Sequence, residues 1–198
     1  PTGKILASIG AIEKIGKQQE KEYEKILNAN SRPAKLPTRK DNFIHILSLD
    51  TGKELQVLGG YITKPQQILF SRDGKRLVSQ DKSSIKVWDI TNGKLVKILN
   101  GNFNALRFIQ LSHNANSIAL QTNDQLKLGK KLQLWNVDSN KLSEVELELN
   151  KEFKGVHFGP DEKTFFLTQL ELNNAGLRTV SVSSGNIETP QKLKIFEY

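Results

Sequence analysis

One turn signature recurs along the chain at nearly constant spacing, and this repeat restricts the possible folds more than any other feature. The stretch "IKVWDITNGKLV", which begins at Ile85, aligns with three others that begin at Ile44, Leu132 and Leu177. A repeat period of 20 to 50 residues is typical of chains that stack copies of one supersecondary unit. The turn residues lie 41, 47 and 45 residues apart, at Gly52, Gly93, Asn140 and Gly185.

A second sequence motif recurs once in each unit, in step with the first. The stretch "FSRDGKRLVS", from Phe70 to Ser79, matches "LSHNANSIAL" and "FGPDEKTFFL", and the opening "PTGKILAS" fits the same place. The turn residues of these stretches are Gly3, Gly74, Ala115 and Glu162. Because two separate sequence motifs recur together, the chain is predicted to contain a true structural repeat.

Each unit is predicted to contain four short strands. β-Branched and aromatic residues dominate the apolar runs, and Asp73-Gly74 and Asn92-Gly93 are tight-turn pairs. We expect an all-β protein in which both faces of the strand at Ile85 are covered. In the second unit the strands are expected at Gln66 to Ser71, Arg76 to Ser79, Ile85 to Ile90 and Lys94 to Leu99.

The units resemble the repeats of the WD40 β-propeller family, because Trp88-Asp89 and Trp135-Asn136 stand before the turn. The resemblance covers the chain except residues 10–42. It implies a β-propeller of four-stranded antiparallel blades, with about four blades present. Leu47 and Val180 take the place of tryptophan in the outer units. Gly60-Tyr61 and Gly101-Asn102 stand where the family favours Gly-His, so a hydrogen-bond network based on that histidine is not expected.

Trp88 is assigned a structural role in this interpretation. Its ring is expected to fill the gap between neighbouring blades, and Asp89 with the Asn92-Gly93 turn is expected to reverse the chain. Trp135 and Asn136 are assigned the same motif in the next unit.

The first unit begins at its second strand, so its blade is expected to be incomplete. Propellers of the family typically have seven blades, and a ring opened here would have an unpaired strand edge and bare apolar faces. We interpret residues 1–198 as a WD40-like segment of a longer propeller, whose missing blades belong to the same or another chain. The lack of methionine, even at position 1, also favours a fragment. A complete four-bladed ring is the alternative.

Residues 10–42 form an insertion where a blade normally has a tight turn. Apolar residues at helical spacing predict an amphipathic helix from about 12 to 28, followed by a basic strap. The insertion could be a solvated loop, a helix docked on its own propeller, or a partner-binding segment, since rigid scaffolds often carry recognition loops. Two smaller loops, Thr122 to Lys131 and Leu170 to Leu177, occupy the same position in later units. The candidate partner-binding residues are Lys14, Lys17, Lys21, Tyr23, Lys25, Arg32, Lys35, Arg39 and Lys40.

No catalytic motif is present. The sequence contains no nucleophile elbow, Walker A loop or dinucleotide fingerprint. Without cysteine there is no disulfide or thiolate metal site. His45, His113 and His157 fall in different units, and His157 is expected in the core or facing the channel. We therefore expect a protein that is not an enzyme and that uses no cofactor or metal.

The function predicted from the sequence is a protein-interaction scaffold module within a larger protein. By family analogy alone it suits bacterial signalling proteins. The rival is a nucleic-acid-binding propeller, because the chain has a net charge of +8 and a pI of about 9.6. However, Tyr23 is the one aromatic residue in the basic insertion, and stacking on bases needs several. No apolar window is long enough to span a membrane, and we expect a cytoplasmic protein.

Overall fold

The regular secondary structure of the described residues is entirely β-strand, so the all-β prediction is confirmed. The computed structural model describes residues 4–10, 42–122, 131–147, 151–172 and 178–197. The helix predicted over 12–28 and the basic strap lie outside these residues. The chain divides into two compact units. Unit 1 is Pro1–Phe70 with Gly74–Asn104, and unit 2 is Ser71–Asp73 with Ala105–Tyr198.

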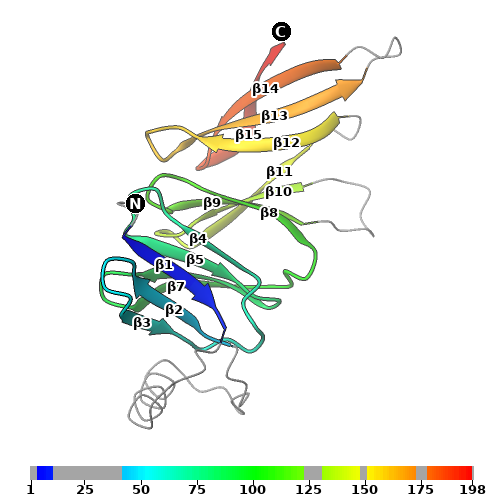
Figure 1. The fold of residues 1–198 in the computed structure, drawn as a ribbon. Coiled ribbons are helices and arrows are strands. Elements are labelled where there is room, and N and C mark those ends of the chain that lie inside the picture. Colours follow the sequence, from blue (N-terminus) through cyan, green and yellow to red (C-terminus); the bar gives the residue numbers. More distant parts are fainter. Residues whose placement is uncertain (1–3, 11–41, 123–130, 148–150, 173–177, 198) are drawn as a thin grey trace. The chain divides into compact units, whose positions relative to one another are not determined.

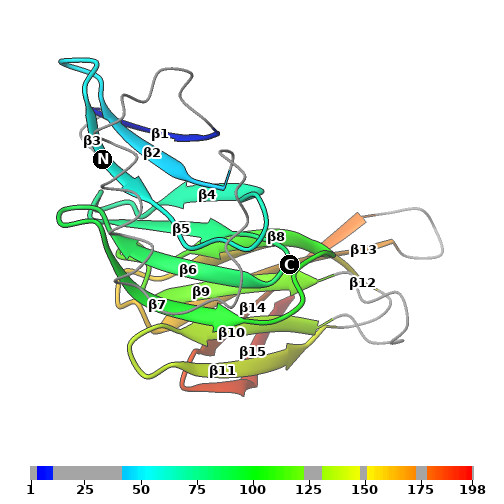
Figure 2. The ribbon, with the colours of Figure 1, turned by 90° about the horizontal axis from the view of Figure 1, so that it is seen from below.

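Unit 1 contains two antiparallel sheets (Figure 1). Both are meanders, in which each strand pairs with the next one along the chain, and Figure 2 shows β4 to β7 side by side in this order. Among the described residues the first sheet has three strands, β1 to β3, without a counterpart of β4, as the sequence predicts. The first sheet is β1 (Ile5–Ile9), β2 (Ile44–Ser48) and β3 (Glu54–Leu58). The second is β4 (Gln67–Phe70), β5 (Arg76–Gln80), β6 (Ser84–Asp89) and β7 (Lys94–Asn100), close to the predicted runs.

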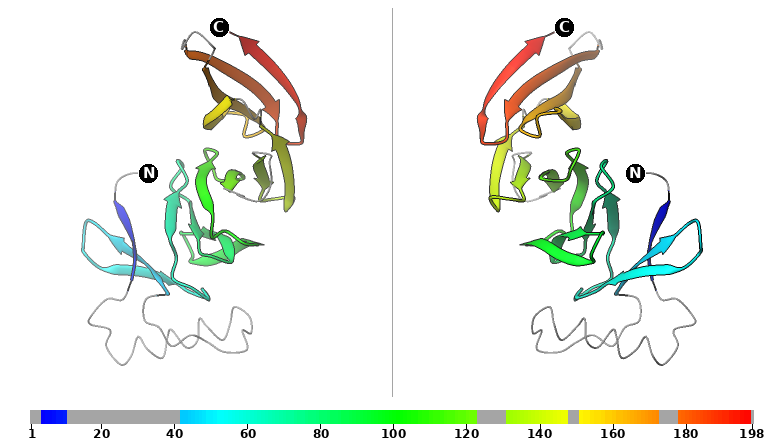
Figure 3. Two further views of the ribbon diagram at one scale, coloured as in Figure 1. Left: turned by 90° about the vertical axis from the view of Figure 1, so that its right-hand side faces the viewer. Right: turned by 90° about the vertical axis from the view of Figure 1, so that its left-hand side faces the viewer.

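Unit 2 repeats this arrangement with two four-stranded antiparallel meanders. The fourth sheet, coloured yellow to red, is seen from two sides in Figure 3. The third sheet is β8 (Leu106–Leu111), β9 (Ser117–Thr122), β10 (Lys131–Asn136) and β11 (Lys141–Glu146). The fourth is β12 (Lys151–Phe158), β13 (Thr164–Leu172), β14 (Arg178–Asn186) and β15 (Thr189–Glu197).

Six of the predicted turn residues have left-handed backbone conformations. The φ angles are 66° at Gly52, 71° at Gly74 and Gly93, 58° at Ala115, 55° at Asn140 and 60° at Glu162. This region favours glycine and costs an alanine or glutamate about 1–2 kcal/mol. At Ala115 the turn is closed by its N–H, which donates to the Ser112 carbonyl at 3.1 Å. Because these six aligned residues share one backbone conformation, the predicted alignment of the repeats is confirmed at these positions.

The fourth repeat departs from the predicted alignment. In every sheet one N–H just after β6, or the strand equivalent to it, donates to the carbonyl of the residue just before β5, or the strand equivalent to it. The donors and acceptors are Leu49 and Lys4, Ile90 and Lys75, Val137 and Asn116, and Ile187 and Lys163. By this marker Gly185, not Val180, occupies the position of Trp88, and Gly185 lies within β14. The prediction for these two residues is wrong because β13 and β14 run for nine residues each, which delays the turn by five positions.

The cores lie between paired sheets, and each sheet has two distinct faces. We call the face that bears Ile44 and Ile46, or their equivalents, the isoleucine face. The face that bears Leu77 and Trp88, or their equivalents, is the tryptophan face. In unit 1 the isoleucine face of the first sheet packs against the tryptophan face of the second, through Ile44, Ile46 and Leu58 with Leu77, Trp88 and Ile90. In unit 2 the third and fourth sheets pack in the same way, through Leu132, Leu134 and Val145 with Phe165, Leu167 and Ile187.

Candidate functional site

The predicted partner-binding residues all lie between positions 11 and 41, outside the described residues. These are Lys14, Lys17, Lys21, Tyr23, Lys25, Arg32, Lys35, Arg39 and Lys40. The two ends of this insertion are described and lie together, because Gly10 N donates to Phe43 O at 3.3 Å. The insertion therefore leaves and re-enters the first sheet at one place.

The three loops predicted to be enlarged share one position in the repeat, between the equivalents of β5 and β6: they are β1–β2, β9–β10 and β13–β14. The first two are long. The third has five residues, as do several other turns, because β13 and β14 are themselves nine residues long. In unit 2 the strand ends that border residues 123–130 and 173–177 lie on the same side of the two sheets (Figure 1). Loops on a rigid scaffold can vary in length without disturbing the core.

The second sheet has a tight turn at this position instead. Asp81 Oδ1 accepts hydrogen bonds from the backbone N–H of Ser83 at 2.8 Å and of Ser84 at 2.6 Å. The hydroxyls of the same two serines also donate to this oxygen. One buried carboxylate thus closes the connection between β5 and β6.

A buried polar network lies beside this turn, between the two sheets of unit 1. The Trp88 Nε1–H group faces two oxygens, Ser79 Oγ at 2.9 Å and the Tyr61 hydroxyl at 3.0 Å. The Tyr61 and Ser79 oxygens are 2.5 Å apart and share a hydrogen bond. Burial raises the pKa of Tyr61 well above its usual range, although the bonds to Ser79 and Trp88 act in the opposite direction. Tyr61 therefore remains a neutral phenol that joins the first sheet to the second.

Lys86 completes the network. Its Nζ donates to the Gly60 carbonyl and lies 4.1 Å from the centroid of the Tyr61 ring. Burial lowers the pKa of Lys86 to about 8, and the nearby Asp81 carboxylate offsets part of that shift. Lysines with a lowered pKa can act as nucleophiles. Here the residue is only 4% exposed, so the arrangement stabilises the contact between sheets and offers no access to a substrate.

The network gives a direct prediction for Tyr61→Phe. The change removes one of the two acceptors of the Trp88 N–H and the partner of Ser79, so we expect the free energy of unfolding to fall by about 1–2 kcal/mol. Urea denaturation measures this effect. In a double-mutant cycle with Ser79→Ala, the combined loss should differ from the sum of the two single losses, because the two hydroxyls bond each other and the double variant alone leaves the Trp88 N–H without either acceptor. Strict additivity would show that the two hydroxyls act independently.

The two Trp-Asp-type motifs contribute packing and turn geometry. Trp88 and Trp135 are both buried. Asp89 accepts from the Thr91 N–H at 2.8 Å and the Thr91 hydroxyl at 2.6 Å, and these bonds hold its pKa below the usual value. Asn136 accepts from the Ser139 N–H at 3.0 Å, and Trp135 Nε1 donates to Asn140 Oδ1 at 3.2 Å. The acidic or amide residue thus caps the turn that follows the third strand.

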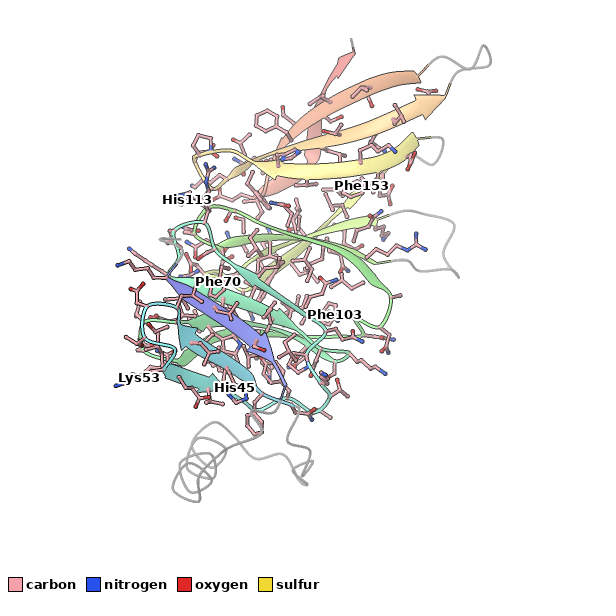
Figure 4. All side chains as sticks on the ribbon, viewed as in Figure 1. His45, Lys53, Phe70, Phe103, His113 and Phe153 are labelled. Atoms are coloured by element: carbon pink, nitrogen blue, oxygen red, sulfur yellow. The ribbon has the colours of Figure 1, made fainter. Side chains whose placement is uncertain are left out.

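The histidines form no common site. Figure 4 shows His45 in unit 1 and His113 in unit 2. His45 is buried, and its Nδ1 lies 2.8 Å from Glu54 Oε2. His113 and His157 are exposed, so the core position, one of the two expected for His157, is wrong; His157 lies on the same face of the fourth sheet as its strand partner Phe166. Within the described ranges there is no group of three or more His, Cys, Asp or Glu residues that could hold a metal ion.

Two apolar faces are exposed in the described part of the chain, in line with the bare faces expected of an opened ring. They are the tryptophan face of the first sheet and the isoleucine face of the fourth sheet, with Leu6, Leu49, Phe166 and Val180 exposed. Alternation of apolar and polar residues identifies a face but does not reveal whether another sheet covers it. The incomplete first unit therefore indicated that apolar faces would be bare, but not which side chains form them.

Comparisons with known proteins indicate the fold alone. No protein-family model and no curated protein matches the chain. Among solved structures, the chain is similar to one titled Kuenenia stuttgartiensis hydrazine synthase, with a TM-score of 0.51 and 14% sequence identity. The match covers 79% of this chain and 47% of that chain, so the present chain spans about half of its length. In the part of the chain described here, no helix is long and apolar enough to cross a membrane.

Proposed function

We propose that this chain is a non-catalytic protein-interaction module, built as a WD40-type propeller segment of a larger protein. The observation that carries the proposal is the position of the elongated loops. Two of the four sheets carry long insertions at the same connection, residues 10–43 between β1 and β2 and residues 123–130 between β9 and β10, whereas the other connections within the sheets have at most five residues. Variation confined to one connection is typical of a scaffold that recognises partners through its loops.

The buried network supports the family assignment. Tyr61 stands where the family favours histidine, and its hydroxyl bonds to Ser79 on β5 and Trp88 on β6. The second tryptophan, Trp135, occupies the equivalent position on β10. A cytoplasmic location and membership of a multi-domain signalling protein are part of the same proposal and rest on family analogy.

The proposed module is non-catalytic, and the burial of the most unusual side chains of unit 1 supports this. Lys86, Ser79 and Asp81 are each at most 4% exposed, and their polar atoms serve the contact between sheets or the turn at Asp81. A catalytic group must reach a substrate. In unit 1 the groups that resemble a reactive cluster are better explained as structural.

The test is partner capture by the full chain and by a variant with residues 12–40 replaced by a short Gly-Ser linker. Because Gly10 and Phe43 are hydrogen-bonded neighbours, a short linker should preserve the first sheet. We expect unchanged circular dichroism, together with at least a tenfold loss of specific proteins recovered from a lysate of the source organism. A matched control replaces residues 123–130, which border β9 and β10, in the same way.

Equal capture by the full chain and the linker variant would refute a contact role for the insertion. If both loop variants capture as before, recognition through this connection is wrong altogether. The rival function, nucleic-acid binding, is tested with a labelled random-sequence oligonucleotide at low and high salt. Strong binding that weakens steeply with salt and disappears in the 12–40 variant would favour the rival.

A further inference from the structure

Three connections of unit 1 meet at one surface, which we call the connection platform. They are residues 59–66 between β3 and β4, residues 81–83 between β5 and β6, and residues 101–104 after β7. The backbone of Lys82 joins all three. Its N–H donates to Thr63 Oγ1 at 3.4 Å, and its carbonyl accepts from the Phe103 N–H at 2.9 Å. Each connection is flanked by described strands on both sides, so the platform is complete within the described part of the chain.

The longest of these connections is held in place from below. Tyr61 is buried and its hydroxyl bonds to Ser79, and Pro65 is buried as well. From the segment that precedes β2, Asn42 Nδ2 donates to the Ile62 carbonyl at 3.3 Å. The backbone around Ile62 is therefore fixed before any partner arrives, and binding there does not have to order it.

Ile62 is the apolar contact that this fixed backbone presents to solvent. It is 64% exposed, the largest exposed fraction of any large hydrophobic residue in the described part of the chain. A single exposed apolar side chain is common on protein surfaces. Ile62 differs from such a residue in its setting, because the residues before and after it are anchored and its neighbours on the platform carry charge.

The charges exposed on residues 59–66, 81–83 and 101–104 are all positive. Lys64 and Lys82 are both exposed. Asp81 is the one acidic residue in these three segments, but it is 1% exposed and its Oδ1 accepts hydrogen bonds within its own turn. The buried Lys86 lies near that carboxylate and offsets its charge. Two exposed ammonium groups therefore set the potential at the platform, which attracts carboxylates.

We propose that the connection platform binds an acidic segment of a partner protein, with an aliphatic side chain on Ile62 and carboxylates on Lys64 and Lys82. The inference rests on the proposed function, because it names the class of partner that the interaction module recognises. Nucleic acid fits the same charges less well. Tyr61 and Phe103 are the aromatic residues of the platform and both are buried, so no ring is available to stack on a base.

The test begins with a displayed library of random short peptides selected on the full chain. We expect the enriched sequences to combine Asp or Glu with an aliphatic residue, and the Kd of the best labelled peptide, measured by fluorescence anisotropy, to rise with salt. Ile62→Asp and the double variant Lys64→Glu/Lys82→Glu should each raise this Kd by at least about tenfold. All three side chains are exposed, so the fold should be retained, which circular dichroism verifies.

The matched control reverses two exposed lysines of unit 1 outside the platform. Lys53→Glu/Lys94→Glu makes the same change in net charge and should keep the wild-type Kd. Lys53 lies far from Phe103 of the platform (Figure 4). An exchange of charge gives the decisive result: a peptide whose acidic residues are replaced by lysine should bind Lys64→Glu/Lys82→Glu more tightly than it binds the wild type.

Several outcomes would overturn the inference. They are enrichment of basic or uncharged peptides, enrichment of no sequence at all, an unchanged Kd in Ile62→Asp, and equal losses in the platform and control double variants. A random-sequence oligonucleotide that binds more tightly than the best peptide, and that loses binding in Lys64→Glu/Lys82→Glu, would assign the platform to nucleic acid instead.

The variant with residues 12–40 replaced by a linker separates this inference from the proposed role of the long loops. The selected peptide should bind this variant as tightly as it binds the full chain, because the platform lies outside the replaced residues. If no acidic peptide binds while capture from a lysate still depends on residues 12–40, the acidic partner alone is wrong. If the peptide binds but neither loop replacement alters capture, the role of the loops alone is wrong.

Discussion

Replacing Trp88 by alanine is expected to lower the free energy of unfolding by about 3–5 kcal/mol, because the change empties the space between the first and second sheets. The indole is 3% exposed and packs in a cluster with Ile44, Ile46 and Leu77. Its Nε1–H also serves both Ser79 and Tyr61, so the truncation leaves two hydroxyls without their donor. Urea unfolding followed by circular dichroism measures the loss.

Two further variants separate packing from hydrogen bonding at this position. Trp88→Phe keeps an aromatic ring but removes the N–H, and its loss should be clearly smaller than that of Trp88→Ala. Ile62→Ala, which changes a 64% exposed side chain, should change stability by no more than about 0.5 kcal/mol. Because Trp135 is the other tryptophan, its fluorescence in the Trp88 variants reports on unit 2 separately. A loss below about 1 kcal/mol for Trp88→Ala would contradict the packing role.

Replacing Lys86 by methionine is expected to raise stability at pH 7, by roughly 1–3 kcal/mol. The pKa of Lys86 is lowered to about 8 by burial, so keeping the ammonium charged in the folded protein is costly at neutral pH. Methionine has a similar length and no charge to desolvate. The variant loses the hydrogen bond to Gly60 and the contact with the Tyr61 ring, which offsets part of the gain.

The pH dependence provides a sharper test of the same residue. Between pH 8 and the unfolded value of 10.5, the unfolded chain binds more protons at Lys86 than the folded chain does. The stability contribution of Lys86 therefore increases as pH rises through this window, and the advantage of Lys86→Met should shrink. Tyr61 affects stability in the opposite direction. Its pKa is raised in the folded protein, so above pH 10 the unfolded chain loses this proton first and the free energy of unfolding falls. The urea midpoints of the wild type and Lys86→Met, measured between pH 7 and 10, report on the lysine without the effect of Tyr61. If the difference between the two midpoints did not change with pH, a buried charge at this position would be contradicted.

Much of the fold follows from the sequence because turns carry local signals. Gly52, Gly74 and Gly93 mark left-handed positions by their residue type, and the repeat extends the same turn to Ala115 and Glu162, where the residue type carries no signal. The alignment failed in the fourth repeat, where no tryptophan marks the third strand. Gly185 resembled a turn residue, although it lies in β14 opposite Phe165.

The buried network was harder to predict from residue identity. Sequence comparison with the family suggests that Tyr61 breaks a network based on histidine. The structure shows that a phenol hydroxyl can reach Ser79 and Trp88 from the same place. The burial of Lys86 also gave no sequence signal, because alternation along a strand predicts a face and not the depth of its cover. Lysine is rarely buried at all.

All the described hydrogen-bonded strand neighbours are consecutive along the chain, in each of the four meanders. In these four sheets, no strand from a distant part of the chain lies between two consecutive strands. Pairing between consecutive strands keeps the loop-closure entropy of each step small and favours rapid folding for an all-β protein. During synthesis on the ribosome, each sheet can therefore assemble as soon as its own strands emerge.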